Sequence, residues 1–210
     1  MGKLCVGRMV LGMVETNCYF VYDSNDKKAI VIDPAKGGSA IREKLSENGI
    51  KVAAILLTHG HFDHIMGVNS LKAETECKLY ALSEELPLCE SSELNASEQI
   101  HHPYTVMPDV LLHDGDEIDI EGLNFKVIAT PGHTAGSCCY YFKKDKVMFT
   151  GDTLFYGSIG RTDLPTGNDK AIIDSIHKLM DMAPDDVKIY PGHGDASTIG
   201  WERSNNPFCA

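Results

Sequence analysis

The stretch T-H-G-H-F-D-H, Thr58 to His64, is the strongest indication of the fold in this sequence. It holds three of the chain's nine histidines and an aspartate, and it directly follows the apolar run Val52–Leu57. A short apolar run of this kind is typical of a buried strand. Imidazoles and a carboxylate fill a core poorly, because each buried polar group must find a partner or lose its hydration without compensation. We therefore expect a functional site at the end of this strand.

The spacing within this stretch separates the side chains into two groups. In an extended segment residues i and i+2 point the same way, so His59 and His61 can face one point in space. If a helix begins after Phe62, Asp63 and His64 lie in its first turn and face a neighbouring point. Neutral imidazole and carboxylate are ligands that suit zinc, iron or manganese. The stretch therefore predicts ligands for two adjacent divalent transition-metal ions, with zinc expected first.

Two later segments share a pattern that adds further ligands. T-P-G-H, ending at His133, and Y-P-G-H, ending at His193, each follow an apolar or β-branched strand and present a histidine after a Pro-Gly turn. Asp152, in F-T-G-D-T, follows another strand and offers a carboxylate that can bridge two ions. A lone histidine is most often a core or surface residue, so the prediction depends on the whole set. The remaining histidines are assigned to the surface or the core: His101, His102, His113 and His177.

The bulk composition limits the partners of the chain. With 210 residues the sequence is long enough for one well-packed unit, and we expect a single domain over residues 1–210 that forms a monomer or a small homo-oligomer. The formal net charge of -11 argues against nucleic acid or an anionic membrane surface as a partner, because both attract basic proteins.

The first residues and the cysteines indicate the compartment. The N-terminal sequence M-G-K-L-C-V-G-R-M-V is broken by glycine and charge, so we expect no signal peptide. No apolar run reaches the length of about 18 residues that a membrane helix needs. The seven cysteines form no C-x-x-C pair, which favours reduced thiols. We therefore expect a cytoplasmic protein.

Hydrophobic periodicity predicts two blocks of strands, each followed by helices. The expected strands are Asn17–Tyr22 and Ala29–Ile32, which form a hairpin, then Val52–Leu57, Ile118–Glu121, Asn124–Ala129, Cys138–Phe142, Val147–Phe149 and Val187–Tyr190. The expected helices are Gly38–Asn48 and Lys170–Met182, with a further helical part before Pro87 in the polar segment Glu84–Met107. This order predicts two sheets packed face to face with helices on their outer sides, an α+β fold.

Four motifs, taken in order, resemble the metallo-β-lactamase superfamily. They are T-H-G-H-F-D-H, T-P-G-H-T, F-T-G-D-T-L-F and Y-P-G-H-G, and the resemblance runs from about Val10 to Pro207. It implies an αββα sandwich of two mixed β-sheets with the metals at one edge. It also implies a structural role for the aspartate of V-I-D-P, Asp33. The implied ligands are His59, His61 and His133 for the first metal, and Asp63, His64 and His193 for the second, with Asp152 between them.

Within the superfamily, residues Phe149–Pro165 are most similar to glyoxalase II and its short single-domain relatives. This similarity implies a binuclear hydrolase that cleaves a small-molecule thioester, such as S-lactoylglutathione, with water activated between the metals and oriented by Asp63 or Asp152. Full glyoxalase II enzymes continue into a helical domain with basic residues for glutathione, whereas this sequence ends at Ala210. The resemblance therefore leaves the thiol carrier open.

Two other interpretations use the same motifs. Persulfide dioxygenases resemble this fold and hold one iron with residues matching His59, His133 and Asp152. A metal-binding scaffold without catalysis is the non-enzyme alternative. Outside the ligand set, Arg161 could contact a substrate anion or pair with a nearby carboxylate, and Tyr156 could line the pocket or be an ordinary packed aromatic.

Overall fold

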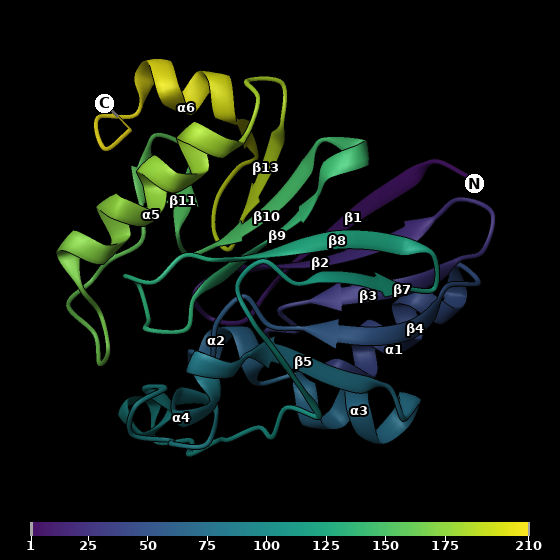
Figure 1. Ribbon diagram of the computed structural model, residues 1–210. Coiled ribbons are helices and arrows are strands. Elements are labelled where there is room, and N and C mark those ends of the chain that lie inside the picture. Colours follow the sequence, from purple (N-terminus) through teal and green to yellow (C-terminus); the bar gives the residue numbers. More distant parts are fainter. Residues whose placement is uncertain (1, 210) are drawn as a thin grey trace.

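The computed structural model describes residues 2–209 and consists of two six-stranded sheets packed face to face (Figure 1). The first sheet contains, in spatial order, β1 (Leu4–Leu11), β2 (Thr16–Asp23), β3 (Lys28–Ile32), β4 (Lys51–Leu56), β5 (Lys78–Leu82) and β6 (Val110–Leu112). The second contains β14 (Ser197–Thr198), β13 (Lys188–Pro191), β10 (Val147–Gly151), β9 (Cys138–Phe142), β8 (Leu123–Ala129) and β7 (Glu117–Ile120). A separate hairpin is formed by β11 (Leu154–Phe155) and β12 (Ser158–Ile159).

Both sheets mix parallel and antiparallel pairs. β1, β2 and β3 pair antiparallel, whereas β3 to β6 pair parallel. In the second sheet, β7 to β10 pair antiparallel and β13 joins β10 in parallel. These pairings confirm the predicted sandwich of two mixed sheets and the predicted hairpin, which is β2 with β3.

Helices cover the outer face of each sheet. The helices are α1 (Gly38–Glu47), α2 (Phe62–Ile65), α3 (Val68–Thr75), α4 (Leu86–Cys89), α5 (Asp169–Met182) and α6 (Ile199–Asn205), with 3-10 turns η1 (Ser83–Glu85), η2 (Ser97–Ile100) and η3 (Lys143–Asp145). In Figure 1, α1, α3 and α4 lie beyond the first sheet, and α5 and α6 lie beyond the second. No helix within residues 2–209 is long and apolar enough to cross a membrane.

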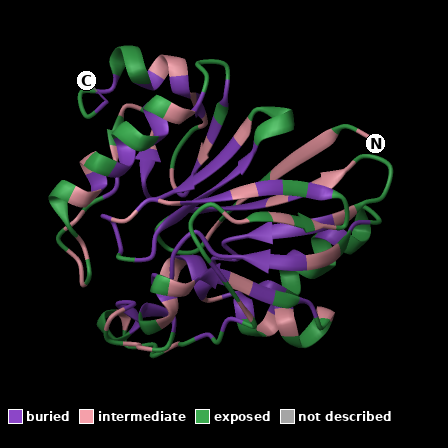
Figure 2. Cartoon of the chain, in the orientation of Figure 1, coloured by how far each residue is buried: buried purple, intermediate pink, exposed green. Residues whose placement is uncertain are grey.

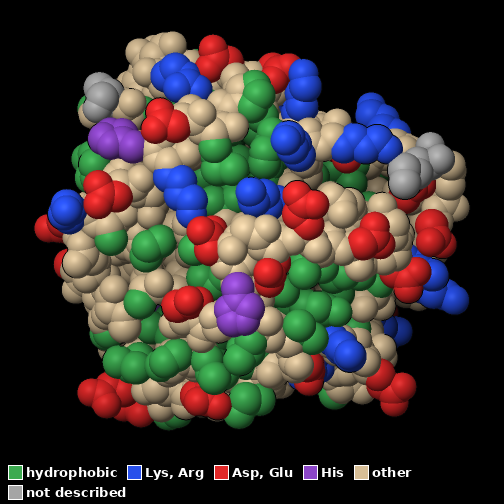
Figure 3. Space-filling model, in the orientation of Figure 1, with side chains coloured by type: hydrophobic (Ala, Val, Ile, Leu, Met, Phe, Trp, Pro, Cys, Tyr) green, Lys and Arg blue, Asp and Glu red, His purple; other side chains and the backbone are tan. Residues whose placement is uncertain are grey.

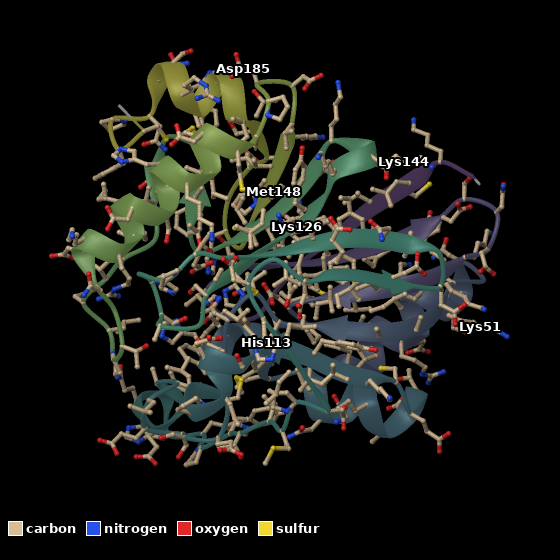
Figure 4. The ribbon with its side chains drawn as sticks, viewed as in Figure 1. Lys51, His113, Lys126, Lys144, Met148 and Asp185 are labelled. Atoms are coloured by element: carbon tan, nitrogen blue, oxygen red, sulfur yellow. The ribbon has the colours of Figure 1, made fainter. Side chains whose placement is uncertain are left out.

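Three apolar layers hold this αββα arrangement together. The central layer lies between the sheets and includes Phe125, Tyr140, Phe142 and Phe149. A second layer packs the first sheet against α1 and α3, and a third packs the other sheet against α5, where Met148 is buried (Figure 4). Figure 2 shows the result, with buried residues along the strands and exposed residues on the outer sides of the helices. On the face shown in Figure 3, acidic and basic side chains are interspersed without a continuous basic surface.

Six strands, β1, β5, β6, β11, β12 and β14, and the helices α3 and α6 were not predicted from the sequence, and one helix begins at a different residue than expected. β1 was not predicted, because Gly7 and Arg8 interrupt its apolar pattern. The ring of Phe20 lies over Gly7, since a Cβ atom at that position would lie 1.9 Å from Cζ of Phe20 and would displace the ring. β5 was likewise missed. The helix expected before Pro87 instead includes it, because α4 begins at Leu86 and the first turn of a helix tolerates the missing N–H of proline.

Replacing Phe149 with alanine should strongly destabilise the fold. Its ring lies between the sheets, with centroids 5.2 Å from Tyr19 and 5.3 Å from Tyr190, and truncation would leave a cavity there. We expect Phe149→Ala to lower the free energy of unfolding by about 3–5 kcal/mol in urea denaturation. Phe208→Ala is the size-matched control, because Phe208 is 41% exposed and its loss should change stability by less than about 1 kcal/mol. Equal effects of the two substitutions would contradict this description of the core.

Candidate metal centre

Strand ends from both sheets bring the predicted ligands together at one edge of the sandwich. β4 begins at Lys51, at the right in Figure 4, and its other end leads into the segment that carries the T-H-G-H-F-D-H ligands. The loops after β8, β10 and β13 carry the remaining ones. Three groups form, in each of which the ligand atoms lie within 4.8 Å of one another: His59, His61 and His133; His59, His64 and Asp152; and Asp63, His64 and His193.

A buried aspartate links the ends of β3 and β4 next to this cluster. Asp33 directly follows β3 with a φ of 52°, and its carboxylate accepts hydrogen bonds from the N–H of Thr58 at 2.8 Å and from its hydroxyl at 2.6 Å. Nδ1 of His64 lies 2.9 Å from the same carboxylate. Asp33 therefore fixes the chain as it enters the ligand segment and orients one ligand ring.

In four of the histidine rings, Nδ1 lies within hydrogen-bond distance of an oxygen atom of the protein. The pairs are His59 with the hydroxyl of Thr58 (3.2 Å), His64 with Asp33 (2.9 Å), His133 with the carbonyl oxygen of Arg161 (2.7 Å) and His193 with the carbonyl oxygen of Val14 (3.1 Å). A ring nitrogen that donates to an acceptor carries the proton, so the lone pair of a neutral ring is then on Nε2. This pattern is typical of metal-binding histidines.

Several buried atoms at the centre have no hydrogen-bond partner among residues 2–209. They are Nε2 of His59, His61 and His64 and Oδ1 of Asp152. Leaving a buried polar atom without a partner is costly, and a bound cation would satisfy several such atoms at one place. Neutral imidazole and carboxylate suit divalent transition metals. The residues present therefore fit divalent metal ions at this site.

Asp152 lies between the ligand groups. Its Oδ2 is 3.6 Å from Nε2 of His133 and 3.4 Å from Nε2 of His193, and its Oδ1 is 3.4 Å from Nε2 of His64. The other carboxylate, Asp63, accepts a hydrogen bond from the hydroxyl of Thr16 at 2.8 Å and lies 3.3 Å from Nε2 of His193. Asp152 therefore faces ligands of both groups, His133 in the first and His64 and His193 in the second, whereas Asp63 faces His193 in the second.

The two ligand groups differ in the direction in which the pKa values of their histidines are shifted. Burial, followed by the neighbouring His133, lowers the pKa of His61 to about 3. For His64 burial acts in the lowering direction, but Asp63, Asp152 and Asp33 outweigh it and raise the pKa well above its usual value. For Asp63 burial acts in the raising direction, and His64 and His193 outweigh it and lower the pKa to about 2. The first ligand group therefore contains a neutral ring, that of His61. In the second group the anionic Asp63 lies beside the protonated His64.

A pocket of about 430 Å³ opens over the cluster. Besides five of the predicted ligands, its lining includes Arg161 and six apolar side chains: Val14, Phe62, Ala96, Phe155, Ile159 and Leu164. The guanidinium of Arg161 makes two hydrogen bonds to the carboxylate of Asp163, at 2.6 and 2.7 Å. The pocket thus has apolar walls and one cation that is already paired.

The two residues considered for substrate contact, Arg161 and Tyr156, lie in different surroundings. Arg161 pairs with Asp163, as one of the two uses considered from the sequence expected, and its carbonyl oxygen also orients His133. It also lines the pocket, and its contact with a substrate anion stays a prediction. Tyr156 is not part of the pocket lining but is 53% exposed and stacks on Trp201, with ring centroids 4.2 Å apart. Its neighbour Phe155 lines the pocket instead.

Some residues of the site carry no recognisable local pattern. Val14 and Phe155 line the pocket from the turn between β1 and β2 and from the β11–β12 hairpin, and Thr16 orients Asp63. A sequence pattern could have indicated the turn through Gly12, but not its proximity to the ligands. The remaining histidines are exposed and lie outside the ligand groups: His101, His102, His113 and His177.

Metal binding at this cluster should stabilise the protein, because the ligand arrangement exists only in the folded chain. We expect zinc at one hundred times its Kd to raise the melting temperature of metal-free protein by about 5–10 °C. His59→Ala should lose most of this increase, whereas His177→Ala, at an exposed position on α5, should keep it. The measurement is thermal denaturation with and without zinc, and an equal increase in both variants would exclude this cluster as the binding site.

Comparison with known proteins agrees with this geometry. The family model of the metallo-beta-lactamase superfamily matches residues 11–193. Hydroxyacylglutathione hydrolase GloC of Haemophilus influenzae is 33% identical over 197 residues, which cover 92% of each chain.

Two solved structures superpose over nearly the whole chain. The B3 metallo-beta-lactamase BLEG-1 has a TM-score of 0.92 and 37% identity, covering 98% of this chain and 99% of its own. TTHA1623, solved in a di-iron-bound form, has a TM-score of 0.86 and 33% identity, covering 96% and 99%. Together with the metal-binding arrangement of its histidines and aspartates, these matches show that the chain belongs to the metallo-β-lactamase superfamily.

Proposed function

We propose that this protein is a metal-dependent hydrolase that cleaves a small-molecule thioester with two metal ions. The observation that carries the proposal is the position of Asp152, whose carboxylate lies 3.6 Å from Nε2 of His133 in the first ligand group and 3.4 Å from Nε2 of both His64 and His193 in the second. A carboxylate between two groups of histidines suits a pair of ions better than a single tetrahedral ion. Zinc is the first expectation, and iron or manganese also suits these ligands.

The chain's own residues would bind and orient the reactants. A pair of bound ions supplies an activated water and stabilises the negative charge that develops on a carbonyl oxygen. Asp63, kept anionic by its pKa of about 2, can accept a hydrogen bond from water in the pocket and so direct its lone pair towards the carbonyl carbon. Asp152 would hold the two ligand groups together, and the apolar walls would exclude competing water.

A thioester suits this pocket because a thiolate leaves without a strong general acid. No lysine, tyrosine or cysteine belongs to the pocket lining formed by the described residues, so the site offers few groups that could protonate a poor leaving group. The apolar walls fit an acyl chain, and Arg161, although paired, lies where a carboxylate of the thiol carrier could reach it. The similarity to a hydroxyacylglutathione hydrolase supports the same reaction class.

Asp152 should be needed for the full metal content. We expect the parent protein to contain about two transition-metal ions per chain after growth in supplemented medium, measured by elemental analysis. Asp152→Ala should lose at least one ion and nearly all turnover, because one carboxylate serves both ligand groups. The control is Asp186→Ala, which removes an exposed carboxylate that pairs with Lys146. Retention of both ions and most of the activity in Asp152→Ala would exclude the bridging role.

His64 separates the hydrolase from a persulfide dioxygenase with one iron. If two ions act together, His64→Ala removes a ligand of the second and should lower kcat for S-lactoylglutathione or a simple acyl thioester by at least about 100-fold. A single iron held by His59, His133 and Asp152 would tolerate this substitution far better. Oxygen uptake is measured in parallel with a glutathione persulfide. We expect none from the parent protein, and stoichiometric uptake by a protein with one iron would overturn the proposal.

A further inference from the structure

A second buried acid, Glu85, lies beneath the ligand cluster and outside the pocket. It ends the 3-10 turn η1 directly after β5, and it is 1% exposed. One carboxylate oxygen, Oε1, accepts a hydrogen bond from the backbone N–H of Gly60 at 2.7 Å. The other, Oε2, accepts one from the backbone N–H of Gly136 and one from the hydroxyl of Thr134, both at 2.9 Å.

These donors belong to the two segments that carry the first group of ligands. Gly60 lies between His59 and His61, and Thr134 directly follows His133. We propose that Glu85 is a positioning residue for metal binding, which fixes the T-H-G-H segment and the loop after β8 relative to each other so that their three histidines converge. The inference rests on metal binding at the proposed site and not on thioester hydrolysis.

Close packing supports this role. A Cβ atom at Gly60 would lie 3.1 Å from Sγ of Cys89, and one at Gly136 would lie 2.2 Å from the backbone nitrogen of Glu85. Both ligand segments therefore pass directly over residues 85–89, with no space for a larger side chain or a layer of water. In this position a single carboxylate can reach both backbones, and a shift of either segment would break its hydrogen bonds.

The chemistry of Glu85 is hard to explain by core packing alone. Burial raises its pKa to about 7, while the hydrogen bonds from Gly60, Thr134 and Gly136 act in the opposite direction. The described part of the chain places no lysine, arginine or histidine in an ion pair with it. An apolar side chain of similar volume would avoid burying an ionisable group, but it would leave the N–H groups of Gly60 and Gly136 without this acceptor. Glu85 accepts hydrogen bonds from three donors in the two ligand segments, which an apolar residue could not do.

Glu85 and Asp33 hold different parts of the same stretch. Asp33 binds Thr58 and His64 at its two ends, whereas Glu85 binds Gly60 at its middle and links it to the neighbouring loop. Partners that orient metal ligands typically change metal affinity by roughly 10–100-fold when they are mutated. We therefore expect an effect of this size at Glu85, although it contacts no ligand ring.

The test compares two substitutions of buried glutamates. In Glu85→Gln the amide oxygen can replace only one of the two carboxylate oxygens, so the NH2 group must face either the N–H of Gly60 or both the N–H of Gly136 and the hydroxyl of Thr134. Glu202→Gln is the matched control, because Glu202 is also fully buried and binds the N–H of Gly157 and the amide of Asn206, away from every ligand. Zinc Kd is measured by chelator competition, and the visible absorption of the cobalt-loaded proteins reports ligand geometry.

We expect Glu85→Gln to raise the zinc Kd of the tighter site by roughly 10–100-fold and to change the cobalt spectrum. Glu202→Gln should lower the melting temperature of the metal-free protein but leave Kd and spectrum unchanged. A folded Glu85→Gln with the parent's Kd and spectrum would overturn the proposal. These readouts do not require turnover, so they hold even if no thioester is hydrolysed.

A milder variant keeps the test decisive if Glu85→Gln does not fold. Thr134→Val removes one donor to Glu85 with little change in shape. We expect its zinc Kd to rise by about threefold or more, corresponding to the loss of one hydrogen bond of modest strength. An unchanged Kd in Thr134→Val would then count against the positioning role of Glu85.

Discussion

The constraint on which the site depends is that polar atoms buried at the strand ends must be satisfied. The protein satisfies the outer nitrogen of four histidine rings itself, with Thr58, Asp33 and two backbone carbonyl groups. The inner atoms of His59, His61 and His64 are left without protein partners. His59 and His64 are held from outside in this way, whereas Nδ1 of His61 lies 2.9 Å from Nε2 of His133 within the cluster, so the ring positions are set before any cation binds. The metal centre is therefore preorganised by hydrogen bonds, and the surrounding fold serves to hold those acceptors in place.

Strand direction explains why ligands so distant in sequence meet. β3 and β4 are parallel, and so are β10 and β13, so each pair ends at one edge of its sheet. β8 runs in the same direction as β10, because both are antiparallel to β9. The loops after all these strands therefore open at the same edge of the sandwich. Each sheet contributes half of a site that neither could form alone.

The sequence predicts site residues that lie together in one stretch better than those brought together by distant contacts. His59, His61, Asp63 and His64 are recognisable because strand and helix geometry convert their spacing into direction within one stretch. Glu85 lies in S-E-E-L-P, which looks like an exposed helix start, and its burial results from contacts 25 and 51 residues away. Phe155 and Tyr156 are neighbours in one short hairpin, where alternation sends one side chain to the pocket and the other to Trp201. No local sequence pattern predicts which of the two side chains enters the pocket.

The scaffold separates metal binding from substrate contact. The ligands follow strands of the two sheets, whereas most of the apolar wall comes from segments that supply no ligand: Val14 from the β1–β2 turn, Phe155 and Ile159 from the β11–β12 hairpin, and Leu164 from the loop before α5. Loops can change without disturbing the strands that position the ions. A B3 metallo-beta-lactamase and a hydroxyacylglutathione hydrolase are similar to this chain at 37% and 33% identity. Because a common fold can carry different pockets, the chemistry of the wall, rather than the name of a relative, determines the substrate.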